Sequence, residues 1–263
     1  MHGLSPLLKL LQAMTDRHRL CTQVWPALLT LLPVFAALVK ERWVSPNGIA
    51  LVSTVFIGVG GTGMLSLVMQ DCGRRRAHKL FRRCGGRPGV EMLRHWNTTV
   101  DRETKRGLRA HLTQRLGIRL PTPAEERRNP AAADKSYQRA VVGCECRSPD
   151  RLSFPLLWQH KTASEFLING LAARWLGFTI ATSVMLWTCL SHSSMSIEEQ
   201  PRLELIASLS LHFGSLSVML VSLLMAVTWL FFFTPHRAVS AAWSYDELLL
   251  EPIGIGKFHA AGD

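Results

Sequence analysis

Four long apolar stretches constrain this chain more than any other feature of its sequence. A helix needs about 20 mostly apolar residues to cross a bilayer, because the hydrocarbon core is about 30 Å thick and each residue rises about 1.5 Å. Inside lipid the backbone must satisfy its own hydrogen bonds, so each stretch is expected to be a helix. The four predicted transmembrane helices cover roughly Thr22–Val39, Gly48–Gln70, Leu171–Leu190 and Leu211–Phe233. The sequence therefore predicts an all-α membrane protein.

The positive charge of the chain is concentrated between the second and third of these helices. The whole chain has a formal net charge of +11. Residues Asp71 to Gly170 contain 21 Lys and Arg residues against 10 Asp and Glu residues, so this segment carries the entire excess. A basic domain of this kind attracts anionic partners, namely nucleotides, nucleic acids or lipid headgroups.

The basic segment is predicted to be mainly helical. Helical structure is expected over Val90–Leu116, with an internal cap offered by Thr98, Thr99 and Asp101. Leu108, Leu112 and Leu116 form its apolar stripe at helical spacing. Prolines predict a loop over Leu120–Ala132, and a further helix is expected to begin at Asp134. That helix carries Tyr137, Ala140 and Val141.

Five segments follow from these patterns. They are an amphipathic N-terminal helix (1–21), transmembrane helices one and two (22–70), a basic cytosolic domain (71–170), transmembrane helices three and four (171–233) and a cytosolic C-terminal tail (234–263). Because Lys and Arg favour the cytoplasmic side, the basic domain and both termini are expected in the cytoplasm, with the acidic loop Ser191–Leu205 outside. For the N-terminal segment, a cytosolic extension of the first span is the alternative interpretation.

Small residues line one face of two predicted spans. The residues in question are Thr54, Gly58 and Gly61 in the second span, and Ser210, Gly214 and Ser217 in the fourth. Such faces let helices approach closely, and they also suit the lining of a pore. The pattern Gly58-Val-Gly60-Gly-Thr-Gly63 matches a dinucleotide fingerprint, but no second strand with an acidic end follows it. Helix packing or a pore lining is the better interpretation, and packing predicts a homo-oligomer.

A dense group of arginines follows the second span directly. The candidate anion ligands are Arg74, Arg75, Arg76, Arg82 and Arg83, together with Arg94 further along the chain. The alternative interpretation is ordinary positive charge at the inner membrane face. The density of charge exceeds what orientation requires, so an anion site is predicted here.

Motifs for catalysis, cofactors or metals are nearly absent. The chain has no GxSxG, HExxH or P-loop sequence, and its acidic residues are scattered. Cys144-Glu-Cys146, even with Cys72, Cys84, His78 and His95, lacks the paired spacing of zinc sites. No ionisable residue lies at the centre of a predicted span, which argues against an ion-coupled transporter but permits a channel. No enzymatic activity, cofactor or metal is predicted.

Several short motifs follow the Gly-rich second span. They are Gly85-Gly86-Arg87-Pro88, Leu93-Arg94, Pro130 with Ala133-Asp134 and Tyr137, Arg147-Ser-Pro-Asp150, and Pro155-Leu156-Leu157. In this order they resemble a family of bacterial membrane proteins that is similar to effectors of anti-phage systems, notably the Hailong-type effector encoded beside a nucleotidyltransferase. The resemblance covers about residues 55–175. A YGFRRN-like segment of that family is replaced by Phe166-Leu-Ile-Asn169-Gly170, so no ligand-binding role is transferred to these positions.

The resemblance implies an oligomeric ion channel in the bacterial inner membrane. Its ligand would be an oligonucleotide that is made during infection and opens the channel. Together with the charge distribution, this predicts a non-enzymatic, ligand-gated membrane effector whose partners are the lipid bilayer, an anionic nucleotide or oligonucleotide, and further copies of itself. The alternative is a membrane-anchored scaffold or sensor that recruits a partner and conducts no ions.

Overall fold

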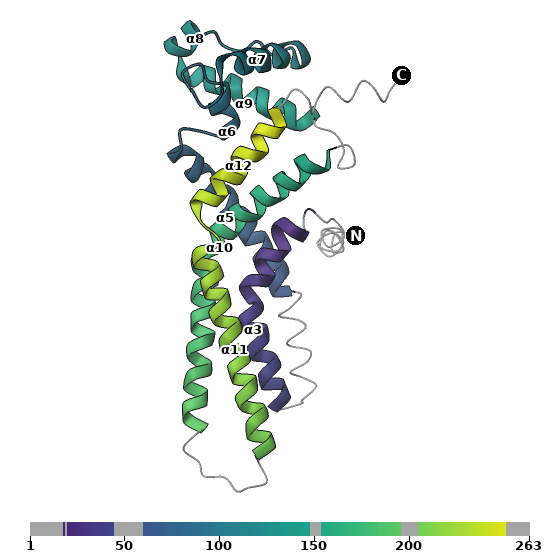
Figure 1. Ribbon diagram of the computed structural model, residues 1–263, viewed down its shortest axis with the longest axis vertical. Helices are drawn as coiled ribbons and strands as arrows, with labels where there is room; N and C mark the ends of the chain where they lie inside the picture. Colours follow the sequence, from purple (N-terminus) through teal and green to yellow (C-terminus); the bar gives the residue numbers. More distant parts are fainter. Residues whose placement is uncertain (1–17, 19, 45–59, 148–153, 196–204, 251–263) are drawn as a thin grey trace, which may run out of the picture. The chain divides into compact units, whose positions relative to one another are not determined.

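The computed structural model describes residues 18, 20–44, 60–147, 154–195 and 205–250 (Figure 1). These residues form helices and short connections, and no strand occurs among them, so the predicted all-α class is confirmed for this part of the chain. The elements are the π-helical turn η1 (Leu20–Val24), α3 (Trp25–Val44), α5 (Thr62–Arg83), α6 (Pro88–Leu93), α7 (Arg102–Leu116), α8 (Pro123–Arg128), α9 (Pro130–Arg147), α10 (Pro155–Met195), α11 (Leu205–Phe231) and α12 (Pro235–Leu250).

The chain divides into two compact units. The first comprises Met1–Arg76 and Glu165–Arg237, and the second comprises Ala77–Ser164 and Ala238–Asp263. We call them the apolar unit and the basic unit. The chain passes from one to the other within the helices α5, α10 and α12. The last helix therefore belongs mostly to the basic unit, although its sequence position suggested a C-terminal tail.

Two helices of the apolar unit are long and apolar enough to cross a membrane. They are Leu20–Lys40, which includes η1 and most of α3, and Gly214–Phe231 in α11. These correspond to the first and fourth predicted spans. The two helices pack against each other in the structure. Length and composition thus support an association of this unit with a membrane.

The other predicted spans have different outcomes. Most of the second span, together with nearly all of the predicted N-terminal helix, lies outside the described residues. Residues of the third span, Leu171–Leu190, are helical and lie within α10. That segment is not among the helices identified as apolar enough to cross a membrane. Arg174 and several Trp, Thr and Ser residues lower its mean hydropathy, so four transmembrane helices stay a prediction.

Two glycines allow α10 to receive large aromatic rings from α11 and the residues that follow it. A Cβ atom at Gly177 would lie 2.2 Å from the indole of Trp229, and one at Gly170 would lie 2.0 Å from the ring of Phe233. Both rings are almost fully buried, and they stack on each other with centroids 4.6 Å apart. The spacing of seven residues places both glycines on one face of α10. Glycine is therefore required at both positions.

A buried asparagine joins three helices of the apolar unit. Asn169 on α10 donates from Nδ2 to the carbonyl oxygen of Thr22 in η1, at 2.8 Å. Its Oδ1 occupies the space that a Cβ at Gly73 on α5 would need, at 2.1 Å. A π-helical turn disturbs the regular pairing of backbone carbonyls. The amide of Asn169 thus gives the carbonyl of Thr22 a partner where the helix is irregular.

The basic unit has its own apolar core, built from α6, α7, α9 and α12. The largest fully buried members include Leu93, Leu112, Tyr137, Val141 and Leu249. The predicted apolar stripe of Leu108, Leu112 and Leu116 lies at this core, with Leu108 and Leu112 buried and Leu116 partly buried. Tyr137, Ala140 and Val141 of α9 are buried as well. Tyr245, Leu249 and Leu250 of α12 complete this core.

Local capping signals decide where these helices begin and end. The helical segment predicted over Val90–Leu116 is interrupted between Leu93 and Arg102. Asp101, one of the residues predicted to offer an internal cap, starts a new helix, α7, by accepting a hydrogen bond from the backbone of Thr104 at 2.8 Å. Gly117, with φ +65°, ends it in the left-handed conformation.

The predicted loop over Leu120–Ala132 is only partly correct. Thr122 and Glu125 form a reciprocal capping box, which starts the short helix α8. Asn129 then accepts from the backbone of Ala132 at 3.1 Å, so α9 begins at Pro130 rather than at Asp134. Proline suits this first helical position because its missing N–H has no partner there.

The Gly177 packing gives a direct test of this part of the fold. We expect Gly177→Ala to destabilise the protein by about 1–3 kcal/mol, since the new methyl group collides with the buried Trp229 ring. The measurement is thermal unfolding of the full chain in mild detergent, followed by tryptophan fluorescence. Gly107→Ala is the matched control, because its Cβ meets nothing within 4 Å and should stabilise α7 by about 0.5–1 kcal/mol. Wild-type unfolding of Gly177→Ala would contradict the packing described.

Candidate anion-binding surface

The C-terminal half of α5 carries most of the arginines that the sequence singled out. We define the α5 basic surface as Arg74, Arg75, Arg76, Lys79, Arg82 and Arg83, all of which are exposed. The helical repeat places Gly73, Ala77 and Leu80 on the opposite side, and these are buried or partly buried. Apart from an exposed ion pair between Arg75 and Asp71 at 2.7 Å, the described residues provide no ion pair for this surface. Its guanidinium groups are therefore free to meet an anion.

Arg94 has a different environment from the other predicted anion ligands. Its side chain is only 13% exposed and pairs with Glu91 and Asp134. The contact with Asp134 is bidentate, with Nε at 3.0 Å and Nη2 at 2.7 Å from the two carboxylate oxygens. Two carboxylates already balance this guanidinium, so its evident role is to hold α6 against α9. Burial raises the pKa of Glu91, and the nearby Arg94 only partly offsets this effect.

A second internal ion-pair network contains residues that sequence reasoning missed. Arg87 donates to Asp246 from Nε at 3.1 Å and from Nη2 at 2.7 Å, and also to Glu145 at 2.8 Å. The same Asp246 accepts from the backbone N–H of Gly89 at 2.8 Å, and the hydroxyl of Tyr245 donates to Glu145 at 3.0 Å. The network joins α12 to α9 and to the start of α6. Arg87 lay within a recognised motif, but only the fold brings Asp246 to it.

In this second network the pKa shifts favour a charged Arg87, a charged Glu145 and a neutral Tyr245. Burial alone would lower the pKa of Arg87, but hydrogen bonds to Asp246 and Glu145 outweigh it and raise that pKa. Burial likewise acts to raise the pKa of Glu145, yet Arg87 and Tyr245 lower it overall. Burial and the carboxylate of Glu145 raise the pKa of Tyr245, which therefore remains a hydrogen-bond donor.

Two further cations of the basic unit are turned inward to backbone carbonyls. Arg109 donates to the carbonyl oxygen of Leu93 at 2.7 Å and to that of Pro121. Lys105 donates to the carbonyl oxygen of Arg94 at 2.9 Å, and burial lowers its pKa. These carbonyls lie in the connections that flank α7, where regular helix partners are lacking. Both cations therefore stabilise the fold and are not available to a ligand.

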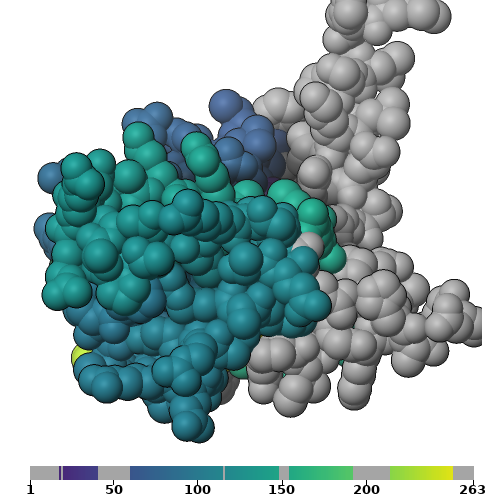
Figure 2. Space-filling model, turned by 90° about the horizontal axis from the view of Figure 1, so that it is seen from above, coloured from purple at the N-terminus to yellow at the C-terminus, as the bar shows by residue number. Residues whose placement is uncertain are grey.

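The surface of the basic unit is left with an excess of positive charge. Among the described carboxylates of the unit, Asp101, Glu103, Glu125 and Glu247 are exposed, and the others face inward, namely Glu91, Glu126, Asp134, Glu145 and Asp246. Exposed cations without an ion pair among the described residues are Arg102 and Arg106 on α7, Arg128 on α8, and Lys135 and Arg139 on α9. Figure 2 shows that these teal helices make up much of one face of the unit. Exposed cations therefore outnumber exposed carboxylates on the described surface of this unit.

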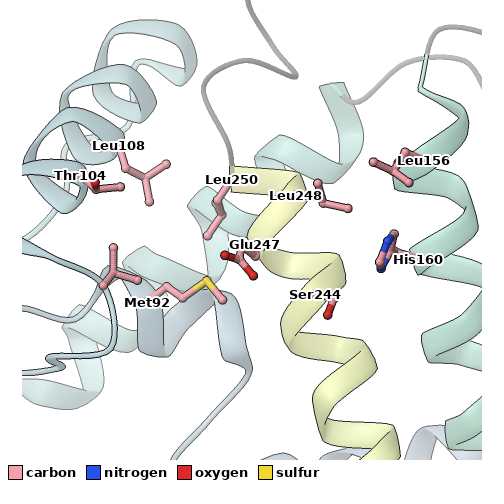
Figure 3. A pocket seen from close by; sticks show the side chains of 10 residues that line it. Met92, Thr104, Leu108, Leu156, His160, Ser244, Glu247, Leu248 and Leu250 are labelled. Atoms are coloured by element: carbon pink, nitrogen blue, oxygen red, sulfur yellow. The ribbon is translucent and has the colours of Figure 1, made fainter.

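The basic unit also contains a pocket of about 430 Å³. Its walls are mostly apolar, with Met92 and Leu108 on one side and Leu156 on α10 on the other, as Figure 3 shows. Helix α12 runs between them and contributes Glu247 and Leu250. None of the residues that line the pocket is Lys or Arg, so it does not suit a phosphate group. The exposed arginines therefore suit an anion better than this pocket does.

The predicted faces of small residues are only partly visible. Thr54 and Gly58 lie outside the described residues, as does the side chain of Ser210. A Cβ at Gly214 would make an ordinary contact with Lys40 of α3 at 3.6 Å. Ser217 is exposed and donates to the carbonyl oxygen of Gly214 at 2.8 Å, while Gly61 is partly exposed just before α5. Among the described residues, neighbouring helices come closest at Gly73, Gly170 and Gly177 instead.

The cysteines considered for zinc do not converge in the part of the chain that the structure describes. Cys144 points into the core of the basic unit, where burial raises its pKa to about 11. Cys146, two residues further along α9, is exposed because a helix turns through about 200° over two residues. No group of three His, Cys, Asp or Glu side chains suitable for a metal occurs among the described residues.

The Arg87–Asp246 pair should contribute strongly to the stability of the basic unit. We expect Asp246→Asn to lower the free energy of unfolding by about 3 kcal/mol, because it leaves a largely buried guanidinium with one carboxylate instead of two. Chemical denaturation of the detergent-solubilised chain measures this effect. Asp71→Asn removes an exposed pair with Arg75 and should change the same quantity by less than about 0.5 kcal/mol. Equal effects of the two substitutions would show that the internal network adds no stability.

The lowered pKa of Glu145 predicts how stability depends on pH. Its folded-state pKa lies below the ordinary value of 4.5, so its contribution is fully present above pH 4.5. That contribution is lost as the pH falls through the folded-state pKa. We therefore expect Glu145→Gln to flatten the dependence of unfolding free energy on pH below about 4.5. Denaturation at a series of acidic pH values measures this slope, and an unchanged slope would contradict the assigned role.

Comparisons with known proteins give no independent assignment. No protein family matches this chain, and no curated protein or solved structure shows significant similarity to it. The resemblance to bacterial anti-phage effectors therefore stays a prediction. The function proposed below is based on the charges and contacts of the described residues.

Proposed function

We propose that this protein is a non-enzymatic membrane effector whose α5 basic surface and basic unit bind an anionic oligonucleotide and thereby gate an ion-conducting assembly of its helices. The observation that carries the proposal is the excess of exposed cations over exposed carboxylates. Five of the described carboxylates of the basic unit face inward and four are exposed, while many more Lys and Arg side chains on α5, α7, α8 and α9 are exposed.

The arrangement of the cations favours a polymer over a single nucleotide. The exposed arginines are spread along helix surfaces, and the mostly apolar pocket of this unit is lined by no Lys or Arg. A single nucleotide is usually held in a concave site with a few convergent polar groups. A phosphate backbone, in contrast, binds through many separate cations, each of which releases a counterion. Two of the aromatics that a base could stack on, Trp96 and Trp158, each carry a cation on the ring, which leaves charge as the main attraction.

The membrane part of the proposal is supported by two apolar helices and by the connectivity of α12. Helix α11 contains a segment apolar enough to cross a membrane, and α12 begins four residues after its end. Asp246 and Leu249 then fix α12 within the basic unit. A ligand that shifts the equilibrium between two arrangements of the basic unit would act on α11 through this helix.

The remaining features of the proposal come from the sequence. The protein is placed in the bacterial inner membrane as a multi-pass homo-oligomer with both termini in the cytoplasm. Its ligand is an oligonucleotide made during phage infection, as the resemblance implies. An oligomer is required because one protomer with so few spans has no room for a pore.

Binding to the α5 basic surface is testable with purified full-length protein. The probe is a fluorescent single-stranded oligonucleotide, and the readout is fluorescence anisotropy over a range of salt concentrations. We expect tight binding at low salt with a steep salt dependence. Replacing Arg74, Arg75 and Arg76 by Gln should weaken binding and reduce the slope of log K against log salt by about 2, since each lost contact removes about 0.7.

Two controls separate binding from insertion and from conduction. Arg127→Gln with Arg128→Gln removes exposed charge from α8 and should change binding less than the α5 triple substitution. Membrane insertion is checked separately, because arginine also sets orientation. Currents across planar bilayers should depend on the oligonucleotide in the wild type and be lost in the triple variant. Binding without any current would favour the membrane-anchored scaffold, and the absence of binding even at low salt would overturn the gating proposal.

A further inference from the structure

Arg174 is an ionisable residue within an otherwise apolar part of α10. Its Nη2 donates to the carbonyl oxygen of Leu230 at 2.9 Å. Leu230 is the penultimate residue of α11, where helix carbonyls lack partners and the helix dipole is negative. Its guanidinium also lies over the ring of Trp175, 5.4 Å from the centroid. The arginine therefore caps the end of the neighbouring helix.

The positive charge of Arg174 remains unbalanced by any described residue. A carbonyl group is neutral, and the Nε of Arg174 is buried without a hydrogen-bond partner. The described carboxylates of the apolar unit are engaged elsewhere, Asp71 with Arg75 and Glu165 with His18. Unpaired charge in apolar surroundings is costly and calls for a counter-ion. Among the described residues Arg174 thus has no counter-ion, and an anion bound from the surroundings would balance its charge.

A second guanidinium lies at the same end of α11. Arg237 is exposed and sits over the ring of Phe232, 4.9 Å from the centroid. Around the two arginines, large aromatic side chains face outward, with Trp175 60%, Phe231 71% and Phe232 40% exposed. Exposed aromatics and arginines at the end of an apolar helix mark the boundary between hydrocarbon and headgroups. This end of α11 therefore has the composition of a membrane interface.

We propose that Arg174 and Arg237 bind the phosphate of an anionic phospholipid headgroup. The guanidinium groups supply the N–H donors and the charge that a phosphate needs. The exposed rings and Leu176, which is 44% exposed, supply an apolar surface for the acyl chains, and a free phosphate would have no use for it. The proposal shares the membrane location with the proposed function but does not depend on oligonucleotide binding or on conduction.

Native mass spectrometry of the full-length protein tests this site. The protein is purified in mild detergent, stripped of lipid and titrated with phosphatidylglycerol or phosphatidylcholine. The wild type should prefer phosphatidylglycerol. Each of Arg174→Gln and Arg237→Gln should weaken phosphatidylglycerol binding about fivefold, the effect expected for one interfacial arginine, with little change for phosphatidylcholine. Arg237 has no hydrogen bond to the backbone of another helix, so its variant keeps the test valid if Arg174→Gln fails to fold.

Matched controls make the outcome decisive. Arg139→Gln and Arg106→Gln remove the same exposed charge from the basic unit and should leave the lipid preference unchanged. Glycerol phosphate, which carries the headgroup chemistry without acyl chains, should not displace the bound lipid. If Arg237→Gln and any folded Arg174 variant keep the wild-type lipid preference, the proposed site is wrong. If glycerol phosphate displaces the bound lipid, the ligand of the site is not a phospholipid. Oligonucleotide anisotropy of Arg174→Gln and Arg237→Gln should match the wild type, so this site can fail independently of the α5 surface.

Discussion

The contact between Arg87 and Asp246 determines how the basic unit is assembled. It joins two residues separated by 159 positions in the sequence, and it brings the last described helix into a core that is otherwise built from residues 77–164. Asp246 also accepts a hydrogen bond from the backbone N–H of Gly89, and the fit is tight there, because a Cβ at Gly89 would lie 3.2 Å from the carboxylate. Because these groups are largely buried, each depends on the presence of the others. These contacts determine where α12 lies within the basic unit. Because α12 follows α11 in the chain, they also connect the end of α11 to this unit.

The same internal pairing explains why the surface is basic. Each inward carboxylate has a structural partner, such as Arg94 for Asp134 or the hydroxyl of Tyr137 for Glu126. Burying an acid next to an arginine costs less than burying either alone, so the acids follow the internal arginines into the unit. The remaining arginines need no internal partner and stay in solvent. Net charge alone therefore understates how positive the accessible surface is.

Sequence patterns were informative wherever the determining interaction is local. Apolar length identified the helices of the first and fourth spans, and helical spacing identified the apolar stripe of α7, in which Leu108 and Leu112 are buried. Nonlocal contacts were out of reach, because nothing in the sequence near Arg94 shows that Asp134 will neutralise it, and nothing near Asp246 indicates Arg87. The helix α8 was missed for a different reason, since prolines were interpreted as loop signals although Pro123 occupies a first helical turn behind the capping box of Thr122.

The packing of α10 against α11 offers a physical reason why hydropathy alone describes α10 poorly. Arg174 lowers the apolar character of this helix, yet its guanidinium is directed to the carbonyl of Leu230. Gly177, only three residues further, admits the buried ring of Trp229, and Gly170 admits that of Phe233. One face of α10 is thus shaped by small residues and a cation to fit the end of α11, where aromatic rings and free carbonyls meet. The features that weaken α10 as an isolated apolar helix are those that make it complementary to α11, so the stability of α10 in any apolar environment depends on its partner.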